Sequence, residues 1–198
     1  LGNLSKIKSS EYSGLFYFID RIKFVNFFVM LKDFSKGRLS WLLLLAFIVF
    51  FEACALFFQH VMMLGPCVMC IYERVAMLSI GVAAIIGAVA PNNPVSRWLG
   101  LAGWGFGAYK GLMLALEHVD YQFNPSPFAT CDLFVTFPSW APLNQWAPWM
   151  FEAYGDCSKV VWQLLDLSMP QWLVIIFAGN LIACGFVIIS QFFKSKND

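Results

Sequence analysis

The chain has 198 residues, of which 60% are hydrophobic and only 13% are charged, and its formal net charge is +1. A soluble domain usually carries about 25% charged residues, so this composition excludes an ordinary soluble domain and also a disordered chain. The small net charge gives no reason to expect a nucleic-acid partner.

The N-terminal part is the least regular. Residues 15–31 are rich in phenylalanine, but Asp20, Arg21 and Lys23 interrupt them, so we do not expect them to span a membrane. Two interpretations of residues 1–29 are open: an amphipathic helix in the membrane interface, or an extension from an upstream start, since Met30 is the first methionine. In both cases we expect residues 1–38 to form an N-terminal cytoplasmic or interfacial segment.

Four later stretches are apolar and long enough to cross a bilayer, which takes about 20 residues in a helix. They cover residues 39–58, 71–90, 98–116 and 170–190. The sequence therefore predicts an all-α membrane protein, a bundle of four transmembrane helices within residues 39–190. The remaining segments are two long loops and a tail, at 59–70, 117–169 and 191–198.

Positive charges indicate the orientation of this bundle. Most basic residues that flank the spans lie on the side of the two chain ends: Lys32, Lys36, Arg38, Arg97, Lys194 and Lys196. The opposite side has only Arg74 and Lys159. The positive-inside rule then predicts cytoplasmic N- and C-termini and two outward loops, which in a bacterial inner membrane face the periplasm.

Two features of the spans predict helix contacts. Glu52 and Lys110 are lone charges at similar depth in the first and third spans, so we predict that they contact each other or share a polar network. The alternative is that Lys110 extends to the interface alone. Gly103, Gly107 and Gly111 recur every four residues, which predicts a close packing seam, although glycine is also generally frequent in membrane helices.

Six cysteines carry most of the expected chemistry, because two histidines argue against an imidazole-rich metal site. Cys54 and Cys184 lie inside predicted spans, where we expect small, buried packing residues with free thiols. The other four are Cys67, Cys70, Cys131 and Cys157, all in the outward loops.

Four thiols on an oxidising face are expected to form two disulfides. A four-cysteine zinc site is an alternative, since C-x-x-C is also a zinc spacing, but Cys131 and Cys157 belong to no such pair. We therefore expect no metal. Two structural disulfides without reactivity remain an open interpretation.

The position of Cys67 and Cys70 favours reactivity. They lie where the second span begins, and a helix N-terminus stabilises a thiolate. Arg74 follows Cys70 by four residues, on the same helix face. No nucleotide-binding or haem motif occurs, so we expect a lipid-soluble quinone as electron acceptor. His118, at the outer end of the third span, is a candidate quinone ligand, or simply part of a hydrated helix end.

Aromatic residues precede the last loop cysteine. Trp140, Trp146, Trp149 and Met150 lie among prolines before Cys157. One interpretation is a short helix lying flat on the outer leaflet, which would hold the cysteine near the membrane. The other is a tryptophan cluster packed under the loop.

Several stretches of this chain resemble the disulfide bond formation protein B (DsbB) family. They are Gln59–Met62, Pro66–Arg74, Glu117–His118, Pro125–Asp132, Gly155–Cys157 and Met169–Trp172. The resemblance runs from about Met30 to the end of the chain, with the cysteines in register.

This resemblance implies an enzyme of the bacterial inner membrane, a quinone-dependent thiol oxidase that reoxidises the periplasmic dithiol protein DsbA. It implies resting disulfides Cys67–Cys70 and Cys131–Cys157, attack by DsbA at Cys131, and attack by the released Cys157 on Cys67. Cys70 would then pass electrons to ubiquinone or menaquinone.

In this scheme the quinone would be bound by Cys70, Arg74 and His118. Two alternatives remain: a paralogue that serves a dedicated DsbA-like partner, and a membrane metal-handling or assembly protein with structural disulfides.

Overall fold

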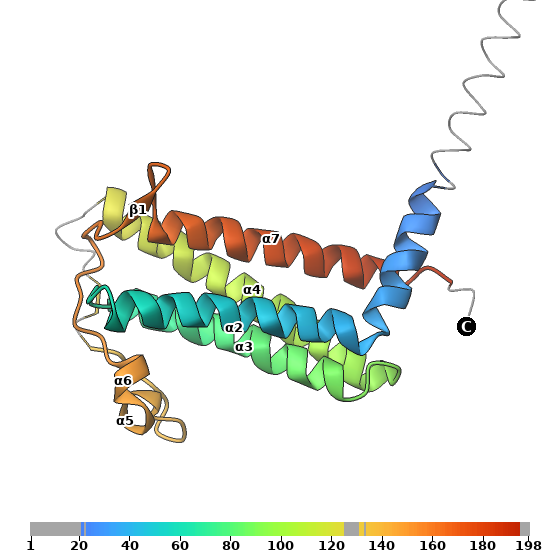
Figure 1. Cartoon of the computed structure of the whole chain (residues 1–198), viewed down its shortest axis with the longest axis horizontal. Helices are drawn as coiled ribbons and strands as arrows, with labels where there is room; N and C mark the ends of the chain where they lie inside the picture. Colours follow the sequence, from blue (N-terminus) through green and yellow to red (C-terminus); the bar gives the residue numbers. More distant parts are fainter. Residues whose placement is uncertain (1–20, 22, 125–130, 133, 195–198) are drawn as a thin grey trace, which may run out of the picture.

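The chain forms an elongated helical bundle. The computed structural model describes residues 21, 23–124, 131–132 and 134–194. Four long helices run side by side (Figure 1): α2 (Arg38–His60), α3 (Val68–Val89), α4 (Pro94–Phe123) and α7 (Met169–Ser190). Shorter elements follow α4 at one end of the bundle: α5 (Leu143–Trp146), α6 (Pro148–Phe151), β1 (Gln163–Leu164) and β2 (Leu167–Ser168). The two strands pair antiparallel.

Three of these helices have the length and composition of membrane spans. Within the described residues, α2, α3 and α7 are long and apolar enough to cross a membrane. They correspond to the predicted spans at 39–58, 71–90 and 170–190. The fourth predicted span, 98–116, lies inside α4, a helix of 30 residues that is less apolar than the other three along its length.

Local sequence signals set the helix starts. The Asn93 side chain caps α4 by accepting a hydrogen bond from Val95 N at 2.9 Å, and Pro94 occupies the first turn. At the start of α7, Ser168 N donates to Gln171 Oε1 at 2.8 Å, which satisfies an otherwise unpaired backbone donor. These caps explain why the loops end where the apolar runs begin.

The predicted glycine seam is confirmed. A Cβ added to Gly107 would overlap Ser79 Oγ and lie 2.8 Å from Ile80 Cγ1, and one on Gly103 would lie 2.9 Å from Ala83 Cβ. Both glycines therefore bring α4 close to α3. Gly111 makes an equally close approach to α7, because a Cβ there would overlap the ring of Phe177.

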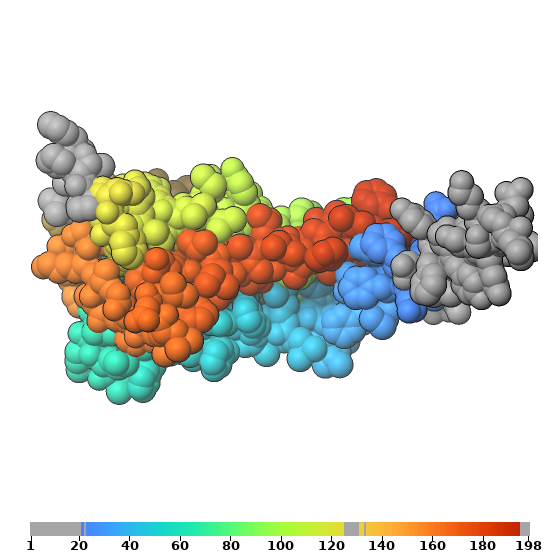
Figure 2. Space-filling view, turned by 90° about the horizontal axis from the view of Figure 1, so that it is seen from above, coloured from blue at the N-terminus to red at the C-terminus, as the bar shows by residue number. Residues whose placement is uncertain are grey.

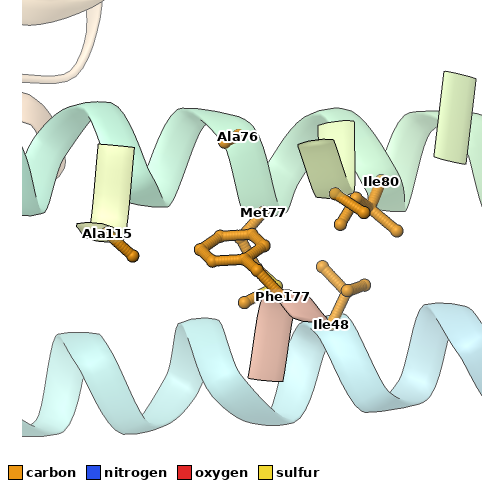
Figure 3. Packing of buried hydrophobic residues seen from close by; sticks show 7 residues of the cluster. Ile48, Ala76, Met77, Ile80, Ala115 and Phe177 are labelled. Atoms are coloured by element: carbon orange, nitrogen blue, oxygen red, sulfur yellow. The ribbon is translucent and has the colours of Figure 1, made fainter. Parts of the chain in front are cut away.

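The core joins all four long helices. Figure 3 shows the Phe177 ring of α7 directed between Met77 of α3 and Ile48 of α2. Ala115 of α4 completes this buried cluster with other small and aliphatic residues. The main cluster thus lies at the centre of the bundle, while many apolar side chains face outward, as expected for surfaces in contact with lipid.

A further helical stretch, residues 23–35, crosses the end of the bundle beside the end of α7 (Figures 1 and 2). Phe28 stacks on Phe193 with ring centroids 4.9 Å apart, and Lys32 Nζ donates to the Phe193 carbonyl at 2.9 Å. Residues 1–20 and 22 of the predicted N-terminal segment lie outside the described residues.

Candidate functional site

The site begins at the first turn of α3. Cys67 is the N-cap residue, and its sulfur accepts a hydrogen bond from Cys70 N at 3.3 Å. Both residues are free thiols with their Sγ atoms 2.7 Å apart. The two expected partners are therefore adjacent at the start of α3.

The other loop pair is oxidised. Cys131 and Cys157 form a disulfide, with Cα atoms 6.2 Å apart. Cys157 is buried in one cluster with Cys67 and Met69, and Cys70 and Cys131 pack against that cluster. The structure therefore brings all four loop cysteines together. The family-like stretch at residues 125–130 lies outside the described residues.

Two glycines allow the loops to meet. Tyr154 N and Gly155 N both donate to the Pro66 carbonyl, at 3.0 and 2.9 Å. A Cβ on Gly155 would overlap the carbonyl oxygen of Gly65, so a larger residue would push the two loops apart. This contact holds the segment before Cys157 against the start of α3.

A cavity of about 540 Å³ lies beside this cluster, between α2 and α7. Direct contacts between α2 and α7 are few, and α3 forms the remaining wall. Most of the lining is apolar, including Phe51, Met77 and Trp172, whereas Cys70 and Arg74 contribute polar atoms. The shape and lining are typical of a site for an apolar ligand with a few polar atoms.

Arg74 organises the polar part of the wall. Its Nη1 donates to Gln59 Oε1 at 2.8 Å and also to the Met150 carbonyl of α6. Its Nε lies 3.6 Å from Glu52 Oε2, and neither of these two buried atoms has a hydrogen-bond partner. These two atoms therefore form a buried ion pair in the wall of the cavity.

The predicted contact between Glu52 and Lys110 is wrong. Glu52 is buried on α2 and pairs with Arg74, whereas Lys110 is exposed on α4. Equal depth along two helices says nothing about the directions in which their side chains point, and here α3 packs against both α2 and α4.

His118 lies away from the cavity lining. Its Nδ1 is 3.0 Å from Glu73 Oε1 and its Nε2 is 3.5 Å from Cys67 Sγ. His118 and Glu73 are both almost fully buried. The structure thus places two of the expected quinone ligands, Cys70 and Arg74, on the cavity wall, and brings His118 to Cys67 instead.

The aromatic loop segment consists of two single-turn helices, not one short helix. The Trp149 carbonyl accepts hydrogen bonds from Gln59 Nε2 at 3.0 Å and from His60 Nε2 at 2.9 Å. Trp140, Trp146 and Trp149 are 80%, 65% and 58% exposed, so they do not pack under the loop. Their exposure favours the membrane-interface interpretation.

The two span cysteines are separate from the thiol cluster. Cys184 is buried on α7 and lies 3.5 Å from the Leu101 carbonyl, in the packing position that we expected. Cys54 is also a free thiol, but it borders the cavity.

Sequence reasoning did not identify Glu52, Gln59 and Glu73 as site residues. Glu52 and Gln59 are seven residues apart, on one face of a helix, and Glu73 directly precedes Arg74. Two polar residues on one face of an otherwise apolar helix could have indicated that this face of α2 borders a polar site. The bonding of Glu73 to His118 required the packing of α3 against α4.

Comparison with known proteins shows the family of this chain. Residues 37–187 match the family model "Disulfide bond formation protein DsbB". Relatives named disulfide bond formation protein B come from Vibrio vulnificus, at 77% identity over 172 residues, and Vibrio cholerae, at 75% over 166 residues. These matches cover 87% and 84% of this chain, and 100% and 96% of the relatives.

A more distant relative, from Aeromonas hydrophila, is 55% identical over 166 residues, which cover 84% of this chain and 96% of the relative. The similarity spans the long helices and both cysteine-bearing loops, since the family model extends from the start of α2 almost to the end of α7. The chain therefore belongs to the DsbB family of disulfide bond formation proteins.

Proposed function

We propose that this protein is a quinone-dependent thiol oxidase of the bacterial inner membrane, which reoxidises a periplasmic DsbA-type dithiol protein. One observation carries the proposal: four loop cysteines form a single cluster, and Cys70 of that cluster also borders an apolar cavity together with Arg74.

The proposed topology has four spans, with α4 as the third. Both chain ends and the turn between α3 and α4 would be cytoplasmic, as the distribution of basic residues indicates. The membrane domain would extend over residues 39–190, between an N-terminal segment and a short tail. Labelling of single cysteines placed at Asn92 and Ser139 with a membrane-impermeant maleimide tests this: only the second should react in intact spheroplasts.

The first exchange takes place in the long loop. A thiolate of the DsbA-type partner attacks Cys131, forms a mixed disulfide, and releases Cys157 as a thiolate. In the resting enzyme a Cys67–Cys70 disulfide is the next acceptor. Cys157 attacks Cys67, which forms a Cys67–Cys157 bond and releases the Cys70 thiolate. The packing of Cys157 against Cys67 supports this route.

The second exchange resets the loop. The partner's other thiolate attacks the mixed disulfide, which releases oxidised partner and a Cys131 thiolate. Cys131 then attacks Cys157, re-forms Cys131–Cys157, and leaves Cys67 and Cys70 reduced. His118, oriented by Glu73, is placed to hold the proton of the Cys67 thiol.

The cavity fits a quinone headgroup. Its walls are mainly apolar, and the buried Arg74 guanidinium, paired with Glu52, is a charged donor suited to a carbonyl oxygen. Cys70 and Arg74 would hold the ring, and a bound quinone would accept two electrons and two protons. Arg74 also provides a fixed positive charge beside the Cys70 thiolate.

The direct test uses the purified full chain in lipid nanodiscs, a reduced DsbA-type protein and a short-chain ubiquinone. Quinone reduction is followed by absorbance, and partner oxidation by thiol counting. We expect one quinone reduced for each dithiol oxidised. Folded protein that oxidises no dithiol, or that does so without reducing quinone, would refute the proposal.

A matched pair of variants controls this assay. Replacing both Cys67 and Cys70 with Ala should abolish quinone reduction, whereas Cys184→Ala, which removes a buried thiol remote from the cluster, should leave it unchanged. Menaquinone analogues assayed in parallel identify the preferred quinone.

A further inference from the structure

Three potential metal ligands meet at the start of α3. The sulfur atoms of Cys67 and Cys70 and a ring nitrogen of His118 all lie within 4.8 Å of one another. Cys67 and His118 are buried, and Cys70 is half-buried. Two thiols and an imidazole are ligands that zinc prefers, and C-x-x-C is a common zinc spacing.

We propose that this cluster is a Cys₂His zinc site, which exists only while Cys67 and Cys70 are reduced. In a tetrahedral site with Zn–S of about 2.3 Å and Zn–N of about 2.0 Å, the S···N separation is about 3.5 Å and the S···S separation about 3.8 Å. The separation of Cys67 Sγ from His118 Nε2 is already 3.5 Å. The two sulfurs, at 2.7 Å, must move apart by about 1 Å.

The cavity provides the room for this movement. Cys70 borders the cavity, so its side chain can rotate away from Cys67 without displacing the buried side of the cluster. Zinc sites with three protein ligands and one open position are well known among metalloenzymes.

Glu73 contacts the ring nitrogen of His118 that does not face the sulfur atoms. Its carboxylate lies 3.0 Å from His118 Nδ1, which would fix the tautomer that presents Nε2 to the metal. Its other oxygen, Oε2, is buried and makes no hydrogen bond to any residue that the structure describes, and Glu73 is only 2% exposed. A neighbouring cation would compensate this buried carboxylate, whose uncompensated charge is otherwise costly.

The redox state controls the site because a disulfide has no thiolate to donate. Binding of Zn²⁺ displaces the two thiol protons to solvent and involves no change in oxidation state. The metal would occupy both sulfurs of the reduced pair, and thereby block their reoxidation. This site goes beyond the proposed oxidase and does not depend on it.

The sequence arguments against a metal do not apply to this set. They excluded an imidazole-rich site and a four-cysteine site, whereas this cluster needs only one of the two histidines. That histidine is 48 positions beyond Cys70 and reaches it only because α4 packs against α3.

Zinc titration of the full chain in detergent tests the proposal. The titration uses a Cys131→Ala/Cys157→Ala background, which removes the other loop thiols, after reduction with a phosphine and with a chromophoric chelator as competitor. We expect one Zn²⁺ per reduced chain and none per oxidised chain. His118→Gln should weaken binding more than 100-fold, and Glu73→Gln by about 10- to 100-fold. Cys184→Ser is the matched control and should bind as the background protein does.

A second measurement replaces zinc with Co²⁺, whose absorption spectrum reports the number of sulfur ligands. A variant that binds metal weakly or folds poorly can therefore be told apart from one that has lost a ligand. The thiolate-to-Co²⁺ absorption should show two sulfur ligands in the background protein, one in Cys67→Ser or Cys70→Ser, and two in Cys184→Ser. Equal binding by the oxidised and reduced chains, or an unchanged cobalt spectrum in Cys70→Ser, would overturn the proposal. Because neither readout uses quinone or a dithiol partner, failure here is distinct from failure of the oxidase assay.

Discussion

The two sides of α3 are packed in different ways. Towards α4, Gly103 and Gly107 leave no room for side chains, and the helices make extensive contact. Towards α2 and α7, the wall of α3 borders a cavity of about 540 Å³. Cys67 and His118 belong to the tight side, whereas Cys70 and Arg74 border the open side.

Because of this difference, the side chains towards α4 are held in fixed positions, whereas those towards α2 and α7 can be reached by a ligand. On the tight side, close packing holds His118 against Cys67, and Glu73, which also borders the cavity, bonds to His118. On the open side, Arg74 and its ion-pair partner Glu52 border the space that a ligand can enter. The first turn of α3 thus directs one sulfur towards His118 and the other towards the cavity, and three substitutions test this division.

The largest effect is expected at the open side. Cys70→Ala should abolish quinone reduction, because the Cys67–Cys70 disulfide could not form and attack on Cys67 would release no thiolate at position 70, while the mixed disulfide between Cys131 and the dithiol partner should still form. Quinone absorbance and non-reducing gels measure the two steps. Quinone turnover in this variant would show that Cys70 is not the electron donor. Cys184→Ala is the control.

A smaller loss is expected for Arg74→Ala. Removing the charged donor should lower kcat or raise KM in quinone-limited assays, with an overall loss of about 10²- to 10³-fold. Arg74→His should be milder, and attack at Cys131 should continue in both variants. Steady-state kinetics with quinone varied, and then with the partner varied, separate the effects.

The matched control is Arg97→Ala, which removes a buried guanidinium that bonds the Pro91 carbonyl in the turn between α3 and α4. It should leave the KM for quinone unchanged. If Arg74→Ala instead blocked the exchange with the dithiol partner and left quinone kinetics normal, the placement of Arg74 on the ligand side would be refuted.

The tight side is tested through stability. In Gly107→Ala the new methyl group would meet Ser79 and Ile80, and would lie 3.2 Å from the Ala76 carbonyl oxygen. We expect a loss of about 1–3 kcal/mol, the usual cost of overpacking. Gly179→Ala on α7, where a Cβ would have no neighbour within 4 Å, should cause no loss. Thermal unfolding in detergent compares them, and equal midpoints would contradict the tight packing.

The smallest effect concerns the exposed loop beside the cluster. The Ser158 side chain and backbone N–H donate to the Asp156 carboxylate, and these bonds lower the pKa of Asp156 below its usual value. This contribution to stability is present above the ordinary pKa of aspartate and is lost as the pH falls through the lowered folded value.

Ser158→Ala should therefore raise the pKa of Asp156, and should change stability by at most about 0.5 kcal/mol at neutral pH, as is usual for surface substitutions. The difference should disappear in acid, where the carboxyl group is protonated in both proteins. NMR measures the titration of the Asp156 carboxyl group in both proteins. An unchanged pKa would show that the Ser158 side chain does not lower the pKa of Asp156. Asp166→Asn, in the β1–β2 turn, should leave the Asp156 titration unaltered.

Much of this protein could be predicted from local sequence. Apolar runs of helical length predicted where the long helices lie, because burying a chain in lipid requires every backbone group to bond within its own helix. The glycine repeat predicted the close approach of α4 to its neighbours. The spacing of Cys70 and Arg74, four residues apart on one helix face, predicted that the two side chains lie near each other, and both border the cavity.

Only the tertiary structure decided which helix faces meet. Span length and depth along the membrane contain no information about rotation around a helix axis, so the predicted pairing of Glu52 with Lys110 was wrong, and the contact of His118 with Cys67 was not foreseen. The cavity, the burial of Cys157 beside Cys67 and the link from Arg74 to α6 likewise depend on contacts between distant segments. Those contacts follow from how four helices and two loops pack at once, which no local pattern determines.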